Sequence, residues 1–191
     1  WATQGKTDLI LDNLIAAKKA RPMLVVMMDG NLGGGGLQGF GEKSLQLFER
    51  ELKDALMPFV DKNFRTAKGN ANTALAGLSM GGLQTLYAGV KNSDRFSYLG
   101  VFSSGWFANQ PAMSDSWYDY LKNNTLTINS NLKQFWIAMG GKEDIAWNNC
   151  QVMMGRLKEL DIKHSYSEYS GGHTWPVWRN NLYNFAQLLF K

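Results

Sequence analysis

The stretch TALAGLSMGG, residues 73–82, decides the fold. Its first six residues are small or apolar, which is typical of a buried strand, and the residues after Gly81 favour a helix. Ser79 lies between the two within the pattern G-x-S-x-G, so the sequence predicts a strand, a sharp turn and a helix. We expect Gly77 and Gly81 to prevent collisions between strand and helix in that turn. This setting predicts a nucleophilic serine; the alternative is a glycine-rich structural turn.

Strand-like and helix-like patterns alternate along the rest of the chain. Apolar residues at helical spacing predict helices over 8–20, 42–61 (with a kink at Pro58), 147–160 and 176–190. Short apolar or alternating runs predict strands over 23–28, 73–78, 98–102, 134–139 and 164–169. This alternation predicts a single α/β domain whose mostly parallel sheet is flanked by helices.

Two segments depart from that alternation. Residues 31–41 contain six glycines and predict a surface loop. The polar stretch 109–131, which carries Trp and Tyr, has the least regular pattern. We expect it to form a partial lid over a site.

Composition excludes several classes of protein. The chain has 191 residues, 45% of them hydrophobic, enough for one domain with a substantial core. No apolar run approaches the ~18 residues needed to cross a bilayer, so no membrane partner is expected. The 20 basic residues are scattered against 16 acidic ones, which argues against nucleic acid binding. One cysteine and two histidines are too few for an intrachain disulfide or a structural zinc site.

A serine nucleophile needs a base, and the chain offers two histidines. His173 lies in the glycine-rich loop GGHTW, between a predicted strand and the last predicted helix, which favours it as the base. His164 alternates with Tyr166 and Glu168 in a strand pattern and is interpreted as a solvent-facing residue.

The acid that orients the base is predicted to be Asp144. It directly follows the predicted strand 134–139, and chemistry gathers at the carboxyl ends of parallel strands. Asp144 also falls between Ser79 and His173 in the chain, as the order Ser, acid, His requires. Glu143 is a weaker candidate, a purely structural carboxylate at the turn stays open, and Asp161 at a helix end is interpreted as a surface charge.

A tetrahedral intermediate also needs donors for its oxyanion. The backbone N–H of Met80, at the start of the helix after the nucleophile, is predicted to be one of them. The second donor normally comes from a loop after an earlier strand, and no suitable segment lies in residues 1–23. The glycine run 33–36 is a weak substitute, since it follows the wrong strand, and we interpret it as a rim of the substrate cleft.

Taken together, these stretches resemble the esterase D-like putative esterases and, within them, the family 1 carbohydrate esterases that remove feruloyl or acetyl groups from xylan. The resemblance covers nearly the whole chain and rests on five motifs: MLVVMMDGN (23–31), MPFVDKNFR (57–65), ALAGLSMGGLQTL (74–86), GKEDIAWNN (141–149) and SGGHTWPVWR (170–179).

The resemblance implies an α/β-hydrolase fold and ester hydrolysis through an acyl-enzyme on Ser79, with no metal or organic cofactor. His173 would serve as base and then acid, and Asp144 would orient it. Trp106 and Trp175 would wall a sugar or phenolic ring, although core packing explains each equally well. The substrate would be a small-molecule or polysaccharide ester, and the protein would be secreted or periplasmic.

The chain departs from the family at its start. It is expected to be one truncated esterase domain over residues 1–191, without the N-terminal strand and the oxyanion loop. Additional modules upstream, as in a larger enzyme, are an open alternative. The absent strand lies between those matching 23–28 and 73–78. These two runs must then pair directly, collapse to another spacing or accept a strand from another chain, because unpaired buried backbone is costly.

Other functions would keep the same residues. An enterochelin esterase-like hydrolase, a thioester hydrolase or an acyltransferase would use the same three side chains. A carbohydrate-binding module without catalysis would not react with a serine-directed phosphonate. An inactive fragment would unfold with poor thermal cooperativity and aggregate readily. The sequence alone leaves these alternatives open.

Overall fold

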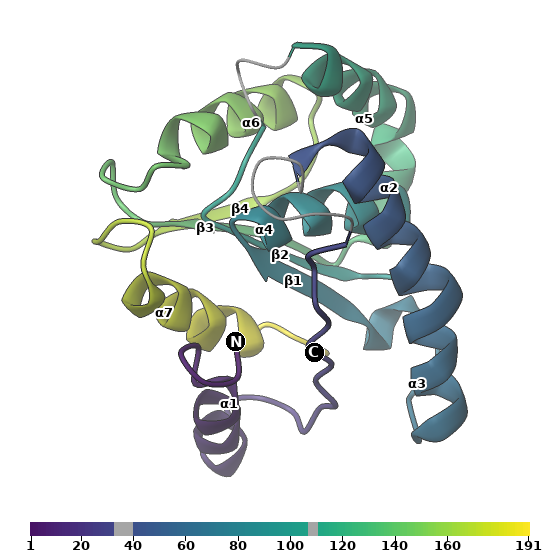
Figure 1. Cartoon of the computed structure of the whole chain (residues 1–191), viewed down its shortest axis with the longest axis vertical. Coiled ribbons are helices and arrows are strands. Elements are labelled where there is room, and N and C mark those ends of the chain that lie inside the picture. Colours follow the sequence, from purple (N-terminus) through teal and green to yellow (C-terminus); the bar gives the residue numbers. More distant parts are fainter. Residues whose placement is uncertain (33–39, 107–110) are drawn as a thin grey trace.

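The computed structural model describes residues 1–32, 40–106 and 111–191 (Figure 1). Its helices are α1 (Thr7–Ala16), α2 (Glu42–Arg50), η2 (Glu51–Leu56), α3 (Met57–Asn63), η3 (Asn70–Asn72), α4 (Met80–Gln84), η4 (Thr85–Gly89), α5 (Pro111–Asn131), α6 (Trp147–Glu159) and α7 (Trp175–Ala186). Its strands are β1 (Ala74–Leu78), β2 (Tyr98–Phe102), β3 (Gln134–Met139) and β4 (Ser165–Glu168). Four of the five predicted strands are therefore confirmed within a residue or two.

The four strands form one parallel sheet in the order β1-β2-β3-β4. Helix α7, with α1 packed behind it, covers one face, while α2, α4, α5 and α6 cover the other (Figure 1). Every residue of β2 is buried, as expected of a strand enclosed between two helical layers. All four strands end at the same edge of the sheet, and this places the residues that follow them together.

Each face of the sheet has its own apolar core. On the α7 face, Phe102 meets Phe185 edge-on at 5.7 Å between ring centroids, and Trp136 stacks on Phe185 at 5.8 Å. On the other face, Leu99, Val101 and other fully buried residues pack beneath the helices. This packing on both faces holds the sheet rigid where the strands end.

Residues 23–28 are the main departure from the sequence prediction, because they do not form a strand. Leu24, Val25, Val26 and Met27 are 54%, 42%, 46% and 49% exposed. Within the described residues, no backbone hydrogen bond joins 22–28 to any other segment, and the sheet ends at β1. An apolar run becomes a strand only when a neighbouring strand exchanges backbone hydrogen bonds with it. Residues 23–28 have no such neighbour within the described parts of the chain. They therefore do not pair directly with β1, although this is one of the sequence expectations.

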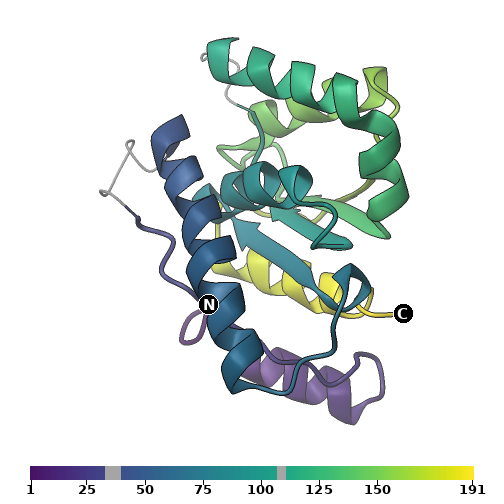
Figure 2. The ribbon, with the colours of Figure 1, turned by 90° about the vertical axis from the view of Figure 1, so that its right-hand side faces the viewer.

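The helix predicted over 42–61 is confirmed, whereas residues 111–131 differ from the prediction. The helix over 42–61 is continuous, as the dark blue rod of Figure 2 shows, and a π-helical stretch (η2) precedes the turn that contains Pro58. Residues 111–131 form the regular helix α5 rather than an irregular lid, because Trp117, Leu121 and Ile128 share a buried face. Residues 109 and 110, like the glycine run 33–36, lie outside the described residues.

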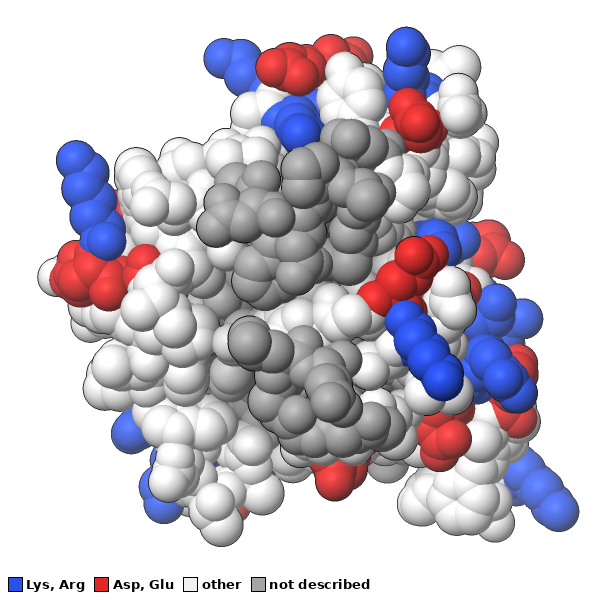
Figure 3. All heavy atoms as spheres, turned by 45° about the horizontal axis from the view of Figure 1, so that its top comes forward, with Lys and Arg blue, Asp and Glu red and all other residues white. Residues whose placement is uncertain are grey.

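Surface charge is mixed. On the face shown in Figure 3, the described Lys and Arg side chains lie beside Asp and Glu side chains rather than in a patch of one sign. No helix in the described parts of the chain is both long and apolar enough to cross a membrane.

Candidate active site

Ser79 sits in a strained turn between β1 and α4. Its φ of 52° and ψ of −117° are rarely adopted by residues other than glycine, and such strain is typical of functional positions. A Cβ on Gly77 would overlap the backbone carbonyl of Gly81, so the expected need for glycine is confirmed there. The same expectation is wrong for Gly81, since a Cβ at that position would meet no described heavy atom within 4 Å.

His173 connects Ser79 to Asp144, although the three lie far apart in the sequence. Its Nε2 lies 2.9 Å from Ser79 Oγ and its Nδ1 lies 2.8 Å from Asp144 Oδ1. In the neutral ring, Nδ1–H donates to the carboxylate and Nε2 accepts the serine proton. The edge of Trp178 supports the ring at 4.9 Å between centroids. The His173 side chain stays 19% exposed, so a substrate can reach it.

Asp144 is buried but strongly hydrogen bonded. Besides His173, its carboxylate accepts hydrogen bonds from Ser103 Oγ at 2.6 Å, from the Ala146 N–H at 3.0 Å and from the Gly140 N–H at 3.4 Å. Burial alone would raise the pKa of Asp144, but the hydrogen bonds from His173, Ser103 and Ala146 outweigh it and lower the pKa. The carboxylate therefore stays ionised at neutral pH and fixes the orientation of the imidazole.

Ser103 was missed by the sequence analysis. It directly follows β2, is fully buried and has a φ of 45°. Its hydroxyl donates to Asp144 and accepts from Trp178 Nε1 at 2.8 Å, so it joins β2, the loop after β3 and α7. The sequence did contain a signal for Ser103, because it is a small polar residue at the carboxyl end of a buried strand. Asp144 was predicted from a similar position, a few residues after β3.

The weaker candidates have structural roles. Glu143 Oε1 accepts a hydrogen bond from the Gly171 N–H at 3.1 Å and so braces the loop that carries His173. The Nδ1 of His164 lies 2.8 Å from the Ile162 carbonyl oxygen. Asp161 is exposed in the turn after α6. None of these side chains contacts Ser79.

The two tryptophans differ in position. Trp106 is 1% exposed and packs in the core, which is the alternative that the sequence left open. Trp175, two residues after His173, is half-buried and meets Trp178 and Trp1 edge-on at 5.1 and 5.6 Å. It lines a cleft that Met80 also borders, and the amide of Met80 begins α4, where a helix leaves its N–H groups without internal partners.

A cysteine nucleophile and a metal site are the other possibilities among the described residues. Burial raises the pKa of Cys150 to about 12, so its thiol is not a nucleophile at neutral pH. Among the described residues, no group of three His, Cys, Asp or Glu side chains is placed to hold a metal ion. The hydroxyl of Ser79 is the nucleophile candidate that contacts His173.

The chain also matches a known protein family. The family model described as putative esterase matches residues 1–188. The chain belongs to this family.

Two relatives of this putative esterase chain are much longer proteins. An endo-1,4-beta-xylanase/feruloyl esterase of Xylanibacter ruminicola is 32% identical over 191 residues, which are all of this chain and 24% of the relative. Endo-1,4-beta-xylanase Y of Acetivibrio thermocellus is 26% identical over 213 residues, covering all of this chain and 19% of the relative. The chain thus spans about a quarter or less of their length.

Solved structures share the fold. A ferulic acid esterase from Anaeromyces mucronatus, in complex with ferulic acid, superposes with a TM-score of 0.78 at 23% identity. The match covers 93% of this putative esterase and 69% of that protein. The α/β-hydrolase fold class predicted from the sequence is confirmed.

Proposed function

We propose that this chain is a serine carboxylic ester hydrolase that removes feruloyl or acetyl groups from xylan. The observation that carries the proposal is the continuous hydrogen-bonded series from Ser79 through His173 to Asp144, at the carboxyl edge of a parallel sheet. This is the arrangement that converts a weakly nucleophilic serine into a strong one.

Acylation begins with proton transfer. As Ser79 Oγ attacks the ester carbonyl carbon, His173 Nε2 takes the hydroxyl proton, and the ionised Asp144 stabilises the resulting imidazolium. The carbonyl oxygen becomes an oxyanion, toward which the Met80 N–H donates a hydrogen bond. When the intermediate collapses, the carbon–oxygen bond to the alcohol breaks, and His173 returns the proton to the departing alcohol oxygen.

Deacylation repeats these steps with water. His173 takes a proton from a water molecule, whose oxygen attacks the acyl carbon and forms a second oxyanion. The bond to Ser79 Oγ then breaks, and His173 gives the proton back to the serine. The carboxylic acid leaves and the resting state is restored, so the reaction consumes one water and needs no redox partner.

The choice of acyl group rests on two lines of support. The relative that is 32% identical bears both a xylanase and a feruloyl esterase name. Trp175 presents part of an aromatic surface two residues from His173, where a phenolic ring of the acyl group would stack. Because xylan is an extracellular polymer, we further infer a secreted or periplasmic protein whose natural setting includes other modules.

Ester turnover by the 191-residue chain and its Ser79→Ala variant tests the proposal. With methyl ferulate and 4-nitrophenyl acetate, we expect kcat to fall by at least 10⁴-fold in the variant, because the nucleophile is lost. A matched control is Ser130→Ala on the exposed side of α5, which should keep full activity. Equal background rates in all three proteins would contradict an esterase and favour a binding module.

The two histidines allow a second matched pair. His173→Ala should lose activity as severely as Ser79→Ala, whereas His164→Ala should retain it, because the Nδ1 of His164 bonds the Ile162 carbonyl oxygen beside its own strand. Labelling with a fluorophosphonate should modify Ser79 alone. Loss of activity in both histidine variants would show that the assignment of the base is wrong.

A further inference from the structure

The indole of Trp178 lies beside both the base and the acid of the candidate site. Trp178 is near the start of α7 and is 7% exposed. Its ring meets the His173 imidazole edge-on, at 4.9 Å between centroids and an interplanar angle of 88°. Its Nε1–H donates to Ser103 Oγ at 2.8 Å, and the Ser103 hydroxyl donates to Asp144 Oδ2 at 2.6 Å. One side chain of α7 therefore contacts the base directly and reaches the acid through a single serine.

Chemistry fixes the direction of these two hydrogen bonds. An indole N–H can only donate, whereas a hydroxyl has one proton to donate and lone pairs that accept. Ser103 must therefore accept from Trp178 and give its own proton to Asp144. Ser103 is fully buried, so bulk water does not compete for either bond. Because a hydroxyl that accepts one hydrogen bond donates a stronger one, the indole strengthens the bond to the carboxylate.

The two oxygens of the Asp144 carboxylate have separate partners. Oδ1 accepts from His173 Nδ1 at 2.8 Å and from the Ala146 N–H at 3.0 Å. Oδ2 accepts from Ser103 at 2.6 Å and from the Gly140 N–H at 3.4 Å, so the serine makes the shorter of its two bonds. Because the carboxylate is planar, fixing Oδ2 also fixes the direction in which Oδ1 faces the imidazole. The serine, with the indole behind it, therefore controls the geometry of the bond between acid and base.

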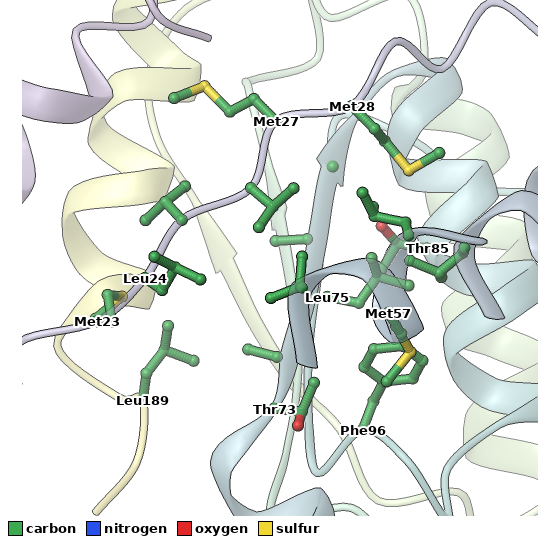
Figure 4. A pocket seen from close by; sticks show the side chains of 18 of the residues that line it. Met23, Leu24, Met27, Met28, Met57, Thr73, Leu75, Thr85, Phe96 and Leu189 are labelled. Atoms are coloured by element: carbon green, nitrogen blue, oxygen red, sulfur yellow. The ribbon is translucent and has the colours of Figure 1, made fainter. Parts of the chain in front are cut away.

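Trp178 lies outside the substrate cleft. The large cleft beside β1 has Leu75 on one wall and Met27 on the other (Figure 4). Trp175 borders this cleft, whereas Trp178 is not among the described residues that line it. An effect of Trp178 on the reaction would therefore pass through the acid and the base, and would change kcat rather than substrate binding.

We propose that Trp178 is a positioning residue of this hydrolase, whose Nε1–H acts through the Ser103 hydroxyl to hold Asp144 in line with the His173 imidazole. This proposal rests on the proposed function, which gives His173 and Asp144 their roles. It requires the N–H of the indole as well as the bulk of the ring. A role in core packing alone would depend on the shape of the ring and not on its N–H.

The replacement Trp178→benzothienylalanine separates these two roles. This amino acid keeps the shape of the bicyclic ring but has sulfur in the place of the indole Nε1–H. We expect kcat for 4-nitrophenyl acetate to fall about tenfold with KM unchanged, because Asp144 is less firmly oriented. The matched control is the same replacement at Trp136, a buried indole that stacks on Phe185 at 5.8 Å, and it should leave kcat unchanged.

A double-mutant cycle with Ser103→Ala tests the path of the effect. In the Ser103→Ala protein the acceptor of the indole is gone, so the replacement at Trp178 should lower kcat by less than about twofold further. An equal loss with and without Ser103 would overturn the proposal. So would an unchanged kcat in the Trp178 variant, a KM that rises as kcat falls, or an equal loss in the Trp136 control.

A measurement on the resting protein separates this proposal from the proposed function. The proton on His173 Nδ1, hydrogen bonded to Asp144, gives a downfield proton NMR resonance that is identified by its absence in His173→Ala. Its exchange with water should be about threefold faster in the Trp178 variant and unchanged in the Trp136 variant. If the unmodified protein hydrolyses no ester, the proposed function fails and this exchange rate alone decides. Equal exchange in the Trp178 variant and the unmodified protein would overturn the positioning role, even if ester turnover still depends on Ser79.

Discussion

On its β2 side, β1 pairs with β2 along its whole length, and it is followed by Ser79, which contacts His173 and, through it, Asp144. On its other side, the same strand faces a cleft whose far wall, residues 22–28, has no backbone hydrogen bond within the described residues. The two neighbours of β1, YLGVF in β2 and MLVVMM in residues 23–28, are both apolar runs. The difference shows that pairing, more than composition, turns an apolar run into a strand.

The first prediction concerns Asp144, on the side of the sheet where Ser79, His173 and Asp144 are hydrogen bonded. Asp144→Asn should lower kcat for 4-nitrophenyl acetate by about 10⁴-fold, because the amide favours the wrong tautomer of His173. Glu143→Gln is the matched control, since that carboxylate accepts a hydrogen bond from the Gly171 backbone, and its kcat should stay within a fewfold of the unmodified protein. A similar loss in both variants would mean that the loop, rather than the carboxylate of Asp144, controls the rate.

The two glycines of the motif differ in the space around them. Gly77→Ala should destabilise the protein by about 3 kcal/mol, because the new methyl group overlaps the Gly81 backbone. Gly81→Ala should instead be neutral or stabilising by up to about 1 kcal/mol, because it adds a better helix former in open space. Urea unfolding of both variants measures the difference. A large loss from Gly81→Ala would indicate that this space is already filled.

The same substitution in two apolar runs makes a third test. Val101→Ala removes a fully buried side chain from β2 and should cost about 2 kcal/mol of unfolding free energy. Val26 is 46% exposed at the cleft, so Val26→Ala should cost less than about 0.5 kcal/mol. Equal losses in urea titrations would show that residues 22–28 pack as tightly as the sheet in solution.

The smallest expected effect concerns Ser103. Ser103→Ala removes a donor to Asp144 and the acceptor of Trp178, and should cost about 1–2 kcal/mol at pH 7. The bond to Asp144 lowers its pKa in the folded protein, so that part of the stability is present above the ordinary value of 3.8. It is lost as the pH falls through the lowered pKa.

Unfolding free energies at pH 7 and pH 3 measure this pH dependence. The difference between the protein and its Ser103→Ala variant should shrink toward the contribution of Trp178 alone. A difference that grew on acidification would contradict the lowered pKa of Asp144.

Much of the site could be predicted because its signals are local. Ser79 is marked by flanking glycines, Asp144 by its place after a strand and His173 by its glycine-rich loop, and the structure brings all three into hydrogen-bonding contact. Ser103 escaped prediction because its role depends on Trp178 and Asp144, which lie 75 and 41 residues away. The regular helix α5 was missed because its buried face is narrow and most of its residues are polar.

The sequence by itself determined the α/β class, four of the strands and the chemistry gathered at their carboxyl ends, because hydrophobic period and glycine placement act over a few residues. Only the tertiary structure decided that residues 23–28 stay outside the sheet and that Trp106 belongs to the core. Both outcomes depend on which neighbour is available to pair or pack. That information lies in contacts between distant segments, so no local pattern contains it.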